Sequence, residues 1–266
     1  MITGRTKLLA IIADPIAQVR TPQAMNTMLS EMGKDAVLVP AEVSREGLTS
    51  VVSGFRNIGN LVGVVVTVPH KTAVPPLCDT LSERAVAAGA VNVIRRDAQG
   101  KLHGDILDGE GFTRGLDDAG ISVSGMSVFL AGAGGAASAI AFALAARGPK
   151  KITISNRTQE KALALAERLS QSFPNVEFCA GDDPNGHDLA VNGTSLGMAL
   201  DDALPFDPAR VQPGAIVAEV IMQPEVTPLL EAAEQLGLAT HGGRKMLQGQ
   251  LSELAKFLTQ DMEDTL

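Results

Sequence analysis

The sequence predicts an α/β fold made of two α/β domains. Short β-rich runs alternate with helical runs along the 266 residues, which is typical of sheets with parallel strands. A cluster of glycines near residues 104–110 interrupts this alternation and indicates a domain boundary. A chain of this length can form two modest domains, each with its own core.

The first half of the chain contains β-rich runs separated by helical ones. We expect strands at residues 8–13, 36–43, 61–68 and 90–95, and helices at residues 21–32, 45–58 and 82–88. Thr21 is a candidate helix cap, with Pro22 at the first helical position. The glycines that follow predict a break in regular structure, at Gly100, Gly104, Gly109 and Gly111.

The second half begins with a predicted helix at residues 111–119 and continues with the same alternation. We expect further strands at residues 128–131, 150–155, 175–179, 189–192, 215–222 and 238–241. The last helix, at residues 245–259, is amphipathic because Leu247, Leu251, Leu254 and Phe257 recur at helical spacing. We expect this helix to return to the first domain.

A glycine-rich turn follows the apolar run at residues 128–131 and leads into an alanine-rich helix. Glycine can adopt the dihedral angles of a tight turn and lets a pyrophosphate approach the main chain. The start of the helix offers free N–H groups to phosphate. The predicted pyrophosphate-binding residues are Gly132, Ala133, Gly134, Gly135 and Ala136. The alternative is an ordinary glycine turn between a strand and a helix.

The end of the next predicted strand indicates which dinucleotide binds. An acidic residue there would bind the 2′-hydroxyl of NAD, but this chain has Asn156 and Arg157, with Lys161 just beyond. These cations suit a 2′-phosphate, so we expect NADP, with NAD as the alternative because Asn156 could bond a ribose hydroxyl. We therefore predict a Rossmann-type dinucleotide-binding domain at residues 108–242. Residues 1–107 with 243–266 form the predicted substrate-binding and catalytic domain.

Composition excludes several classes of protein. The net charge of −8 argues against nonspecific nucleic-acid binding, and no apolar run is long enough to span a bilayer. The two cysteines have no metal-like spacing and no signal peptide precedes the first strand, so we expect a cytoplasmic protein without a metal. The chain contains no tyrosine, so no phenol can serve as the acid or base.

Two segments carry candidate catalytic side chains. Lys71 follows the predicted strand at residues 61–68, and ligands bind at the carboxyl ends of strands in open α/β sheets. Asp108 lies at the predicted domain boundary. A lysine and an aspartate that converge on one hydroxyl suit proton transfer during alcohol oxidation. On position alone, a lysine such as Lys71 is more often a solvated surface charge, and His70 beside it is not expected to be catalytic.

Ordered stretches over nearly the whole chain resemble the shikimate/quinate dehydrogenase family. Those of the first half are Asp14-Pro15-Ile16, Thr21-Pro22, Asn26, Val66 to Lys71, Gly89 to Asn92, and Gly104-Asp105 with Asp108-Gly109. Those of the second half are Gly132 to Ala136, Asn156 to Thr158, Asn192 to Met198, Pro224, Thr227-Pro228, Met246-Leu247 and Gln250. Their order and spacing together are highly specific.

The resemblance implies an enzyme that reversibly oxidises a ring hydroxyl of a cyclic polyol acid and passes the hydride to a nicotinamide. It implies that Lys71 handles the proton of this hydroxyl and that Asp108 holds hydroxyl and lysine in register. The implied substrate-binding positions are Val19, Thr21, Thr67, Asn92, Met222 and Gln250. To the cofactor positions named above it adds Thr158, Thr194, Val220 and Gly243, the last two beside the nicotinamide.

The chain departs from the family pattern mainly on the substrate side. Val19 stands where shikimate-oxidising members carry a hydroxyl residue that binds the substrate carboxylate. The other departures are Val65 for asparagine, Ile106-Leu107 for a polar pair, Glu219 for aspartate and Met222 for tyrosine. A lost hydrogen bond to a charged group costs about 1.5–3 kcal/mol, which weakens shikimate binding about 10- to 100-fold unless Arg20 or Gln18 compensates.

These departures leave several functions open. We expect a divergent member that binds shikimate weakly, and the alternatives are a quinate or amino-shikimate dehydrogenase. A sensor that binds cofactor and metabolite without turnover is a further alternative, although it would not need Lys71 and Asp108. The expected partner is a small cyclic polyol acid, and the expected state is a monomer or a homodimer.

Overall fold

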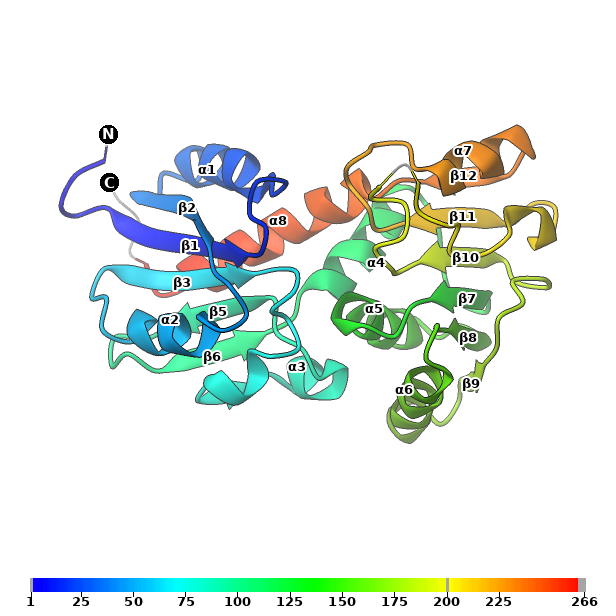
Figure 1. Cartoon of the computed structure of the whole chain (residues 1–266), viewed down its shortest axis with the longest axis horizontal. Coiled ribbons are helices and arrows are strands. Elements are labelled where there is room, and N and C mark those ends of the chain that lie inside the picture. The colour runs from blue at the N-terminus through cyan, green and yellow to red at the C-terminus, as the bar shows by residue number, and fades with distance from the viewer. Residues whose placement is uncertain (1, 200, 263–266) are drawn as a thin grey trace. The chain divides into compact units, whose positions relative to one another are not determined.

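The computed structural model describes residues 2–199 and 201–262 of the chain. The chain divides into two compact units, one of Met1–Leu107 with Leu251–Leu266 and one of Asp108–Gln250. Each unit contains one six-stranded sheet, made of β1 to β6 in the first unit and β7 to β12 in the second (Figure 1). Among the described residues, no helix has the length and apolar character needed to cross a membrane.

The sheet of the first unit has the strand order β2-β1-β3-β5-β6-β4. Parallel pairing joins β1 to both β2 and β3, so the carboxyl ends of these three strands lie at one edge of the sheet. The strands of this unit are β1 (Lys7–Ala13), β2 (Ala36–Glu42), β3 (Leu61–Val66), β4 (Thr80–Leu81), β5 (Val93–Arg96) and β6 (Leu102–Asp105). Its helices are α1 (Thr21–Glu31), α2 (Leu48–Phe55) and α3 (Glu83–Ala88), with a short 3₁₀ turn at Pro75–Leu77.

The strand β5 runs antiparallel to both β3 and β6, whereas the sequence pattern predicted parallel strands. The connection from β5 to β6 is a hairpin too short for a parallel crossover, and Gly100 adopts φ +81° in its turn. Gly100 therefore interrupts regular structure as predicted, whereas Gly104 does not. Gly104 lies within β6, where a Cβ atom would come 2.9 Å from three neighbouring side chains.

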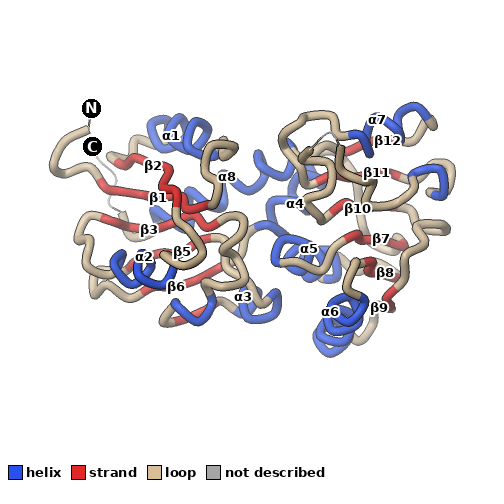
Figure 2. The backbone as a smooth tube through the Cα atoms, in the orientation of Figure 1, coloured by secondary structure: helices blue, strands red, loops and turns tan. Residues whose placement is uncertain are grey.

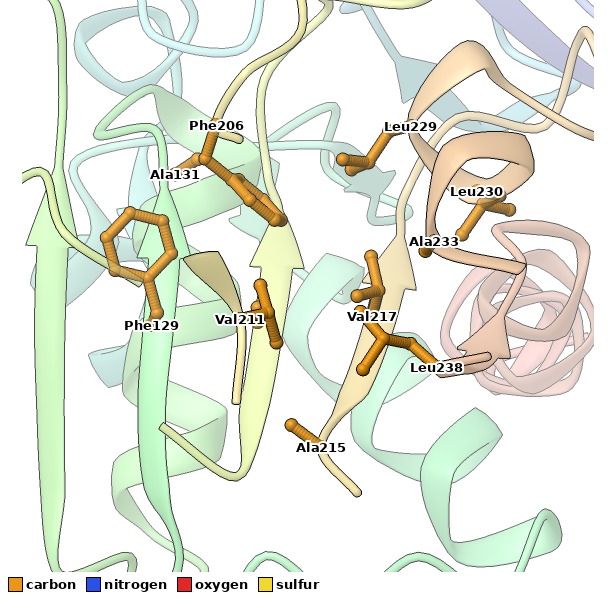
Figure 3. Packing of buried hydrophobic residues seen from close by; sticks show 11 residues of the cluster. Phe129, Ala131, Phe206, Val211, Ala215, Val217, Leu229, Leu230, Ala233 and Leu238 are labelled. Carbon is orange, nitrogen blue, oxygen red and sulfur yellow. The ribbon is translucent and has the colours of Figure 1, made fainter. Parts of the chain in front are cut away.

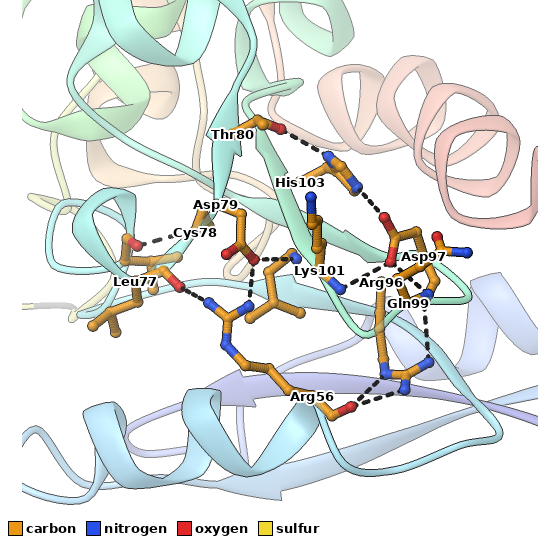
Figure 4. Close-up of polar contacts among 12 residues, drawn as sticks. Arg56, Leu77, Cys78, Asp79, Thr80, Arg96, Asp97, Gln99, Lys101 and His103 are labelled. Atoms are coloured by element: carbon orange, nitrogen blue, oxygen red, sulfur yellow. Dashed lines mark hydrogen bonds and ion pairs between the residues drawn. The ribbon is translucent and has the colours of Figure 1, made fainter.

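Polar side chains fasten this hairpin to its neighbours (Figure 4). His103 lies between Asp97 and Thr80, with ring nitrogens 3.0 Å and 2.7 Å from their oxygens. Asp79 accepts a hydrogen bond from the Leu102 main chain and forms an ion pair with Arg56. These contacts hold the short edge strand β4 against β6 although only two residues pair.

The second unit contains a fully parallel sheet with the order β12-β11-β10-β7-β8-β9. The order reverses between β7 and β10, and this switch point is where ligands bind in doubly wound folds. Its strands are β7 (Ser127–Ala131), β8 (Lys151–Ser155), β9 (Glu177–Ala180), β10 (Leu189–Asn192), β11 (Ile216–Glu219) and β12 (Ala239–His241). Its helices are α4 (Asp108–Asp118), α5 (Gly135–Ala145), α6 (Gln159–Ser172) and α7 (Pro228–Gln235) (Figure 2).

One face of this sheet packs an apolar cluster against α7 (Figure 3). Phe129 of β7 lies edge-on to Phe206, with ring centroids 5.3 Å apart. The same cluster contains Val217 of β11 and Leu229 and Leu230 of α7, and all three are buried. Each Å² of apolar surface that is buried contributes about 25 cal/mol to the free energy of folding, so this cluster stabilises the unit.

Helix α4 packs closely on both of its neighbours because it is rich in glycine. A Cβ atom on Gly109 would lie 2.3 Å from the Ala139 carbonyl oxygen of α5. On α8 (Arg244–Thr259), Gly249 fits against the Gly111 main chain in the same way. Gly109 and Gly111, predicted to lie in a break, therefore serve helix packing.

The last helix, α8, is divided between the units, since residues up to Gln250 belong to the second unit and those from Leu251 to the first. Our sequence prediction placed this transition at residue 243, and it lies later because the first turns of α8 pack on α4. In the first unit, Leu258 lies over Gly63 of β3, where a Cβ atom would come 2.3 Å from its Cδ2 atom. Residues 263–266, included in the predicted first domain, lie outside the described residues.

The start of α1 also differs from the prediction. Thr21 is the first residue of the helix and not its cap, and Pro22 follows at the second position. The residue before the helix, Arg20, makes no capping hydrogen bond through its side chain. The start of the helix is therefore favoured by the fixed φ angle of Pro22 and not by a hydroxyl cap.

We expect the Gly109→Ala substitution to destabilise the protein by about 1–3 kcal/mol, because the new methyl group would meet main-chain atoms of α5. Urea denaturation at neutral pH measures this change. Gly54→Ala is the matched control, since Gly54 lies in helix α2 with no atom within 4 Å of a built Cβ. That control should be neutral or stabilise by up to about 1 kcal/mol. Equal effects of the two substitutions would contradict the packing argument.

Candidate active site

Lys71 lies in a turn that follows the carboxyl end of β3. The main chain of this turn is held by its neighbours, since Thr67 N donates to Ile12 O at 3.1 Å and Val91 N donates to Lys71 O at 2.8 Å. The Lys71 and Thr67 residues are both half-buried. The predicted proton-handling lysine thus stands on a rigid part of the sheet edge.

Asn92 lies at the amino end of β5 and is 2% exposed. Its carbonyl accepts a hydrogen bond from Val66 N at 2.7 Å, next to the turn that carries Lys71. Its side-chain Oδ1 accepts a hydrogen bond from Leu107 N at 2.9 Å. Asn92 therefore connects the end of β3 with the segment that leads directly to Asp108.

Asp108 is the first residue of α4 and is 3% exposed. Its Oδ1 atom accepts a hydrogen bond from Nε2 of Gln250 at 2.9 Å, although the two residues are 142 positions apart. A carboxylate at the start of a helix is also favoured by the helix dipole. Lys71 belongs to the first unit and Asp108 to the second, and their convergence on one hydroxyl remains a prediction.

The glycine turn after β7 carries the residues predicted to bind a pyrophosphate. Gly132 adopts φ +114°, and a Cβ atom there would come 3.0 Å from the Gly193 carbonyl oxygen. Gly134 precedes helix α5 and makes no side-chain cap, and a built Cβ on it meets no atom within 4 Å. The first turn of α5 contains no acidic residue, so its N–H groups can receive an anion.

The end of β8 presents the predicted ribose-phosphate residues. Arg157, Thr158 and Lys161 are exposed, as a site for a solvated phosphate requires. The Asn156 amide is engaged with the main chain, because its Oδ1 accepts from Ala133 N at 3.1 Å and its Nδ2 donates to Thr158 O at 2.9 Å. Asn156 therefore ties the glycine turn to the end of β8. A pocket of about 260 Å³ lies beside it, between the ends of β8 and β9.

A buried carboxylate joins the two loops that follow β10 and β11. Glu219 is 0% exposed and accepts hydrogen bonds from Nδ2 of Asn192 at 3.0 Å and from Oγ1 of Thr227 at 3.0 Å. Asn192 in turn accepts hydrogen bonds from the main chain and hydroxyl of Thr194. Burial raises the pKa of the Glu219 carboxyl, and the hydrogen bonds from Asn192 and Thr227 oppose this rise.

The sequence prediction did not include this cluster, although it noted Glu219 as a departure. The available signal was a polar residue at the last position of two apolar strands, Asn192 and Glu219, which the sheet pairs directly. The cluster supports residues that were predicted to bind cofactor or substrate. Val220 directly follows Glu219, and a Cβ atom on Gly243 would lie 2.6 Å from the Val220 carbonyl carbon. Met222, in the same loop, is 37% exposed.

The predicted carboxylate-binding positions lie at the start of α1. Thr21 is buried, Val19 is half-buried, and Arg20 and Gln18 are exposed. Val65, which replaces an asparagine of the family pattern, is buried within β3. Apolar side chains therefore stand at two positions, Val19 and Val65, where the family pattern has polar ones.

Two segments of the chain match models of known protein families. Residues 11–94 match the model of the shikimate dehydrogenase substrate binding domain, and residues 117–180 match that of shikimate/quinate 5-dehydrogenase. A curated shikimate dehydrogenase (NADP(+)) of Rubrobacter xylanophilus is 39% identical over 251 residues, covering 92% of this chain and 88% of the relative. The chain belongs to the shikimate dehydrogenase family.

Solved structures agree with this assignment. A shikimate 5-dehydrogenase of Listeria monocytogenes, in complex with shikimate and NAD, is 33% identical with a TM-score of 0.87, covering 97% of this chain and 93% of that one. A quinate dehydrogenase of Corynebacterium glutamicum, in complex with NAD, is 29% identical with a TM-score of 0.85, covering 96% and 94%. The predicted family, its oxidoreductase class and the two-domain α/β fold are confirmed.

His241 is a buried residue at the end of β12, two positions before the predicted cofactor residue Gly243. It is 4% exposed, its Nε2 atom has no hydrogen-bond partner among the described residues, and its ring lies edge-on to Phe112 of α4. Burial lowers the pKa of the imidazole, and the charge of Lys245 lowers it further. The folded protein therefore holds a neutral histidine where the unfolded chain would take up a proton.

We expect stability to fall as the pH is lowered through about 6.5, because only the unfolded chain then protonates this histidine. The slope should reach at most about 1.4 kcal/mol per pH unit for one proton. Urea denaturation between pH 7.5 and pH 5 should give a shallower slope for His241→Leu than for the wild type. Lys245→Gln should have an intermediate slope. Identical slopes for all three proteins would show that His241 titrates normally.

Proposed function

We propose that this chain catalyses reversible, NADP-dependent hydride transfer at a ring hydroxyl of shikimate or a related cyclic polyol acid, with weakened recognition of shikimate. The observation that carries the proposal is the hydrogen bond between Gln250 Nε2 and Asp108 Oδ1 at 2.9 Å. It joins a residue assigned to substrate hydroxyls with one assigned to proton transfer, across 142 residues of sequence. Family membership supports the same reaction.

The proposed chemistry divides between side chains of the two units. When bound, NADP supplies the hydride acceptor in the oxidation and the hydride donor in the reverse reaction. Lys71 takes the hydroxyl proton as the carbinol carbon becomes a carbonyl, and it returns that proton during reduction. Asp108 holds the hydroxyl and the lysine in register, so that the proton passes to Lys71 and not to another group. Asn92, Thr67 and Gln250 bond other ring oxygens and set which hydroxyl reacts.

The residues around the glycine turn fit NADP better than NAD. The end of β8 carries no acid that would bind a 2′-hydroxyl, and it offers Arg157 and Lys161 at an exposed position. Because both ends of the Asn156 amide already bond the main chain, Asn156 is better suited to shaping the turn than to binding the ribose. The curated relatives carry NADP(+) in their names, which supports this preference.

The predicted substrate-binding residues support a preference for acids whose binding depends less on a carboxylate contact at position 19. The side chain of Val19 cannot donate a hydrogen bond, so Thr21 supplies the only hydroxyl of the predicted pair. The resemblance of the fold to a quinate dehydrogenase makes quinate the first alternative to test. We further propose a cytoplasmic enzyme, supported by two free cysteines, Cys78 and Cys179.

Replacement of Arg157 and Lys161 by alanine tests the cofactor assignment. We expect the KM for NADP to rise about 10- to 100-fold, because charge-assisted bonds to the 2′-phosphate are lost. The KM for NAD should change less than about threefold, since NAD lacks this phosphate. Steady-state kinetics with each nucleotide gives both values. A parallel rise for NAD and NADP would argue against a 2′-phosphate site.

A steady-state comparison of shikimate, quinate and amino-shikimate with NADP tests the reaction and the weakened recognition. We expect Val19→Ser to raise kcat/KM for shikimate about 10-fold through one restored bond to the carboxylate. Val19→Ala is the control for the change of size and should not raise it. Lys71→Ala should remove turnover with every acid. Turnover that survives Lys71→Ala would refute the proposed role, and no effect of Val19→Ser would refute the weakened recognition.

A further inference from the structure

A buried histidine precedes the proposed catalytic lysine. His70 is 1% exposed, and its Nε2 atom lies 2.8 Å from the carbonyl oxygen of Val43. We propose that His70 is a positioning residue that holds Lys71 in place through this hydrogen bond. The inference rests on the proposed function, because it takes Lys71 as the group that handles the substrate proton.

The chemistry of this contact determines the state of the imidazole ring. A main-chain carbonyl only accepts hydrogen bonds, so the Nε2 atom of His70 must carry a hydrogen and donate it to Val43. The Nε2–H tautomer satisfies this requirement.

The contact connects the ends of two strands that do not pair with each other. Val43 directly follows β2, His70 lies in the turn after β3, and β1 lies between these strands in the sheet. The His70 side chain therefore spans the carboxyl end of β1. Val43 is itself fixed, because its N–H donates to Ala13 O at 3.0 Å.

Main-chain hydrogen bonds also hold this turn. Thr67 N donates to Ile12 O at 3.1 Å, Asp14 N donates to Val68 O at 3.2 Å, and Val91 N donates to Lys71 O at 2.8 Å. The carbonyl of His70 also accepts from Ala73 N at 2.9 Å, which closes the turn after the lysine. The hydrogen bond from His70 to the Val43 carbonyl differs from these bonds because a side chain forms it.

A displacement of this turn would move the Lys71 ammonium group. Placement errors of about 1 Å can cost on the order of 100-fold in rate, even when the changed residue does not touch the substrate. Dinucleotide binding would be unaffected, because the glycine turn and the end of β8 belong to the other unit. A positioning role therefore predicts a loss of kcat without a change in the KM for NADP.

Substitution of His70 tests the proposal in the full-length enzyme with shikimate and NADP. We expect His70→Leu to lower kcat about 10- to 100-fold with the KM for NADP unchanged. His70→Gln should recover most of the activity, because its Nε2–H can reach the same carbonyl. His70→Asn carries the amide on a shorter side chain and should resemble His70→Leu. If His70→Leu does not fold, His70→Asn takes its place in the test.

A second buried histidine is the control for a purely structural effect. His187 is 6% exposed, and its Nδ1 atom lies 3.0 Å from the Pro184 carbonyl oxygen in the other unit. We expect His187→Leu to lower the thermal unfolding temperature as His70→Leu does, but to leave kcat unchanged when assayed well below that temperature. An equal loss of kcat in both variants would mean that destabilisation alone lowers the activity.

The Lys71→Ala variant separates failure of this inference from failure of the proposed function. If turnover survives in Lys71→Ala, the proposed function is wrong. If Lys71→Ala is inactive but His70→Leu retains the wild-type kcat, Lys71 is catalytic and the positioning role of His70 is wrong. A rise in the KM for NADP in His70→Leu would also overturn the inference, because it would indicate a change that reaches beyond the turn.

Discussion

Parallel strand pairing is the constraint on which the candidate site depends. When neighbouring strands run in one direction, their carboxyl ends and the residues that follow them gather at one edge of the sheet. In the second unit, this edge carries the glycine turn after β7, Asn156 after β8 and the Asn192–Glu219 pair at the ends of β10 and β11. In the first unit, it carries Val43 after β2 and Lys71 after β3.

The antiparallel strand β5 adds to this arrangement. Because β5 runs opposite to β3, its amino end lies beside the carboxyl end of β3, and Asn92 thereby comes next to the Lys71 turn. The hairpin then returns the chain through β6, whose end leads to Asp108. One reversed strand thus brings an amide, a lysine turn and the approach to a carboxylate to the same edge.

Buried polar groups hold the loops of the site because the carboxylates of Glu219 and Asp108 accept hydrogen bonds there. Glu219 accepts from side chains and from the main chain of Val220 and Ile221, so the loop after β11 folds around its carboxylate. Asp108 accepts from Gln250 in a similar way on the glycine-rich contact of α4 with α8. An unpaired charge at either position would be costly to bury, which favours a single loop arrangement.

The sequence by itself determined the features that depend on neighbouring residues. The apolar run before Gly132 predicted a strand, a turn and a helix start, and the structure has all three, with φ +114° at Gly132. Tertiary structure alone decided pairs that are distant in sequence, such as Gln250 with Asp108 and His70 with Val43. The physical reason is that strand order, direction and register select these partners, and local residue spacing carries no information about them.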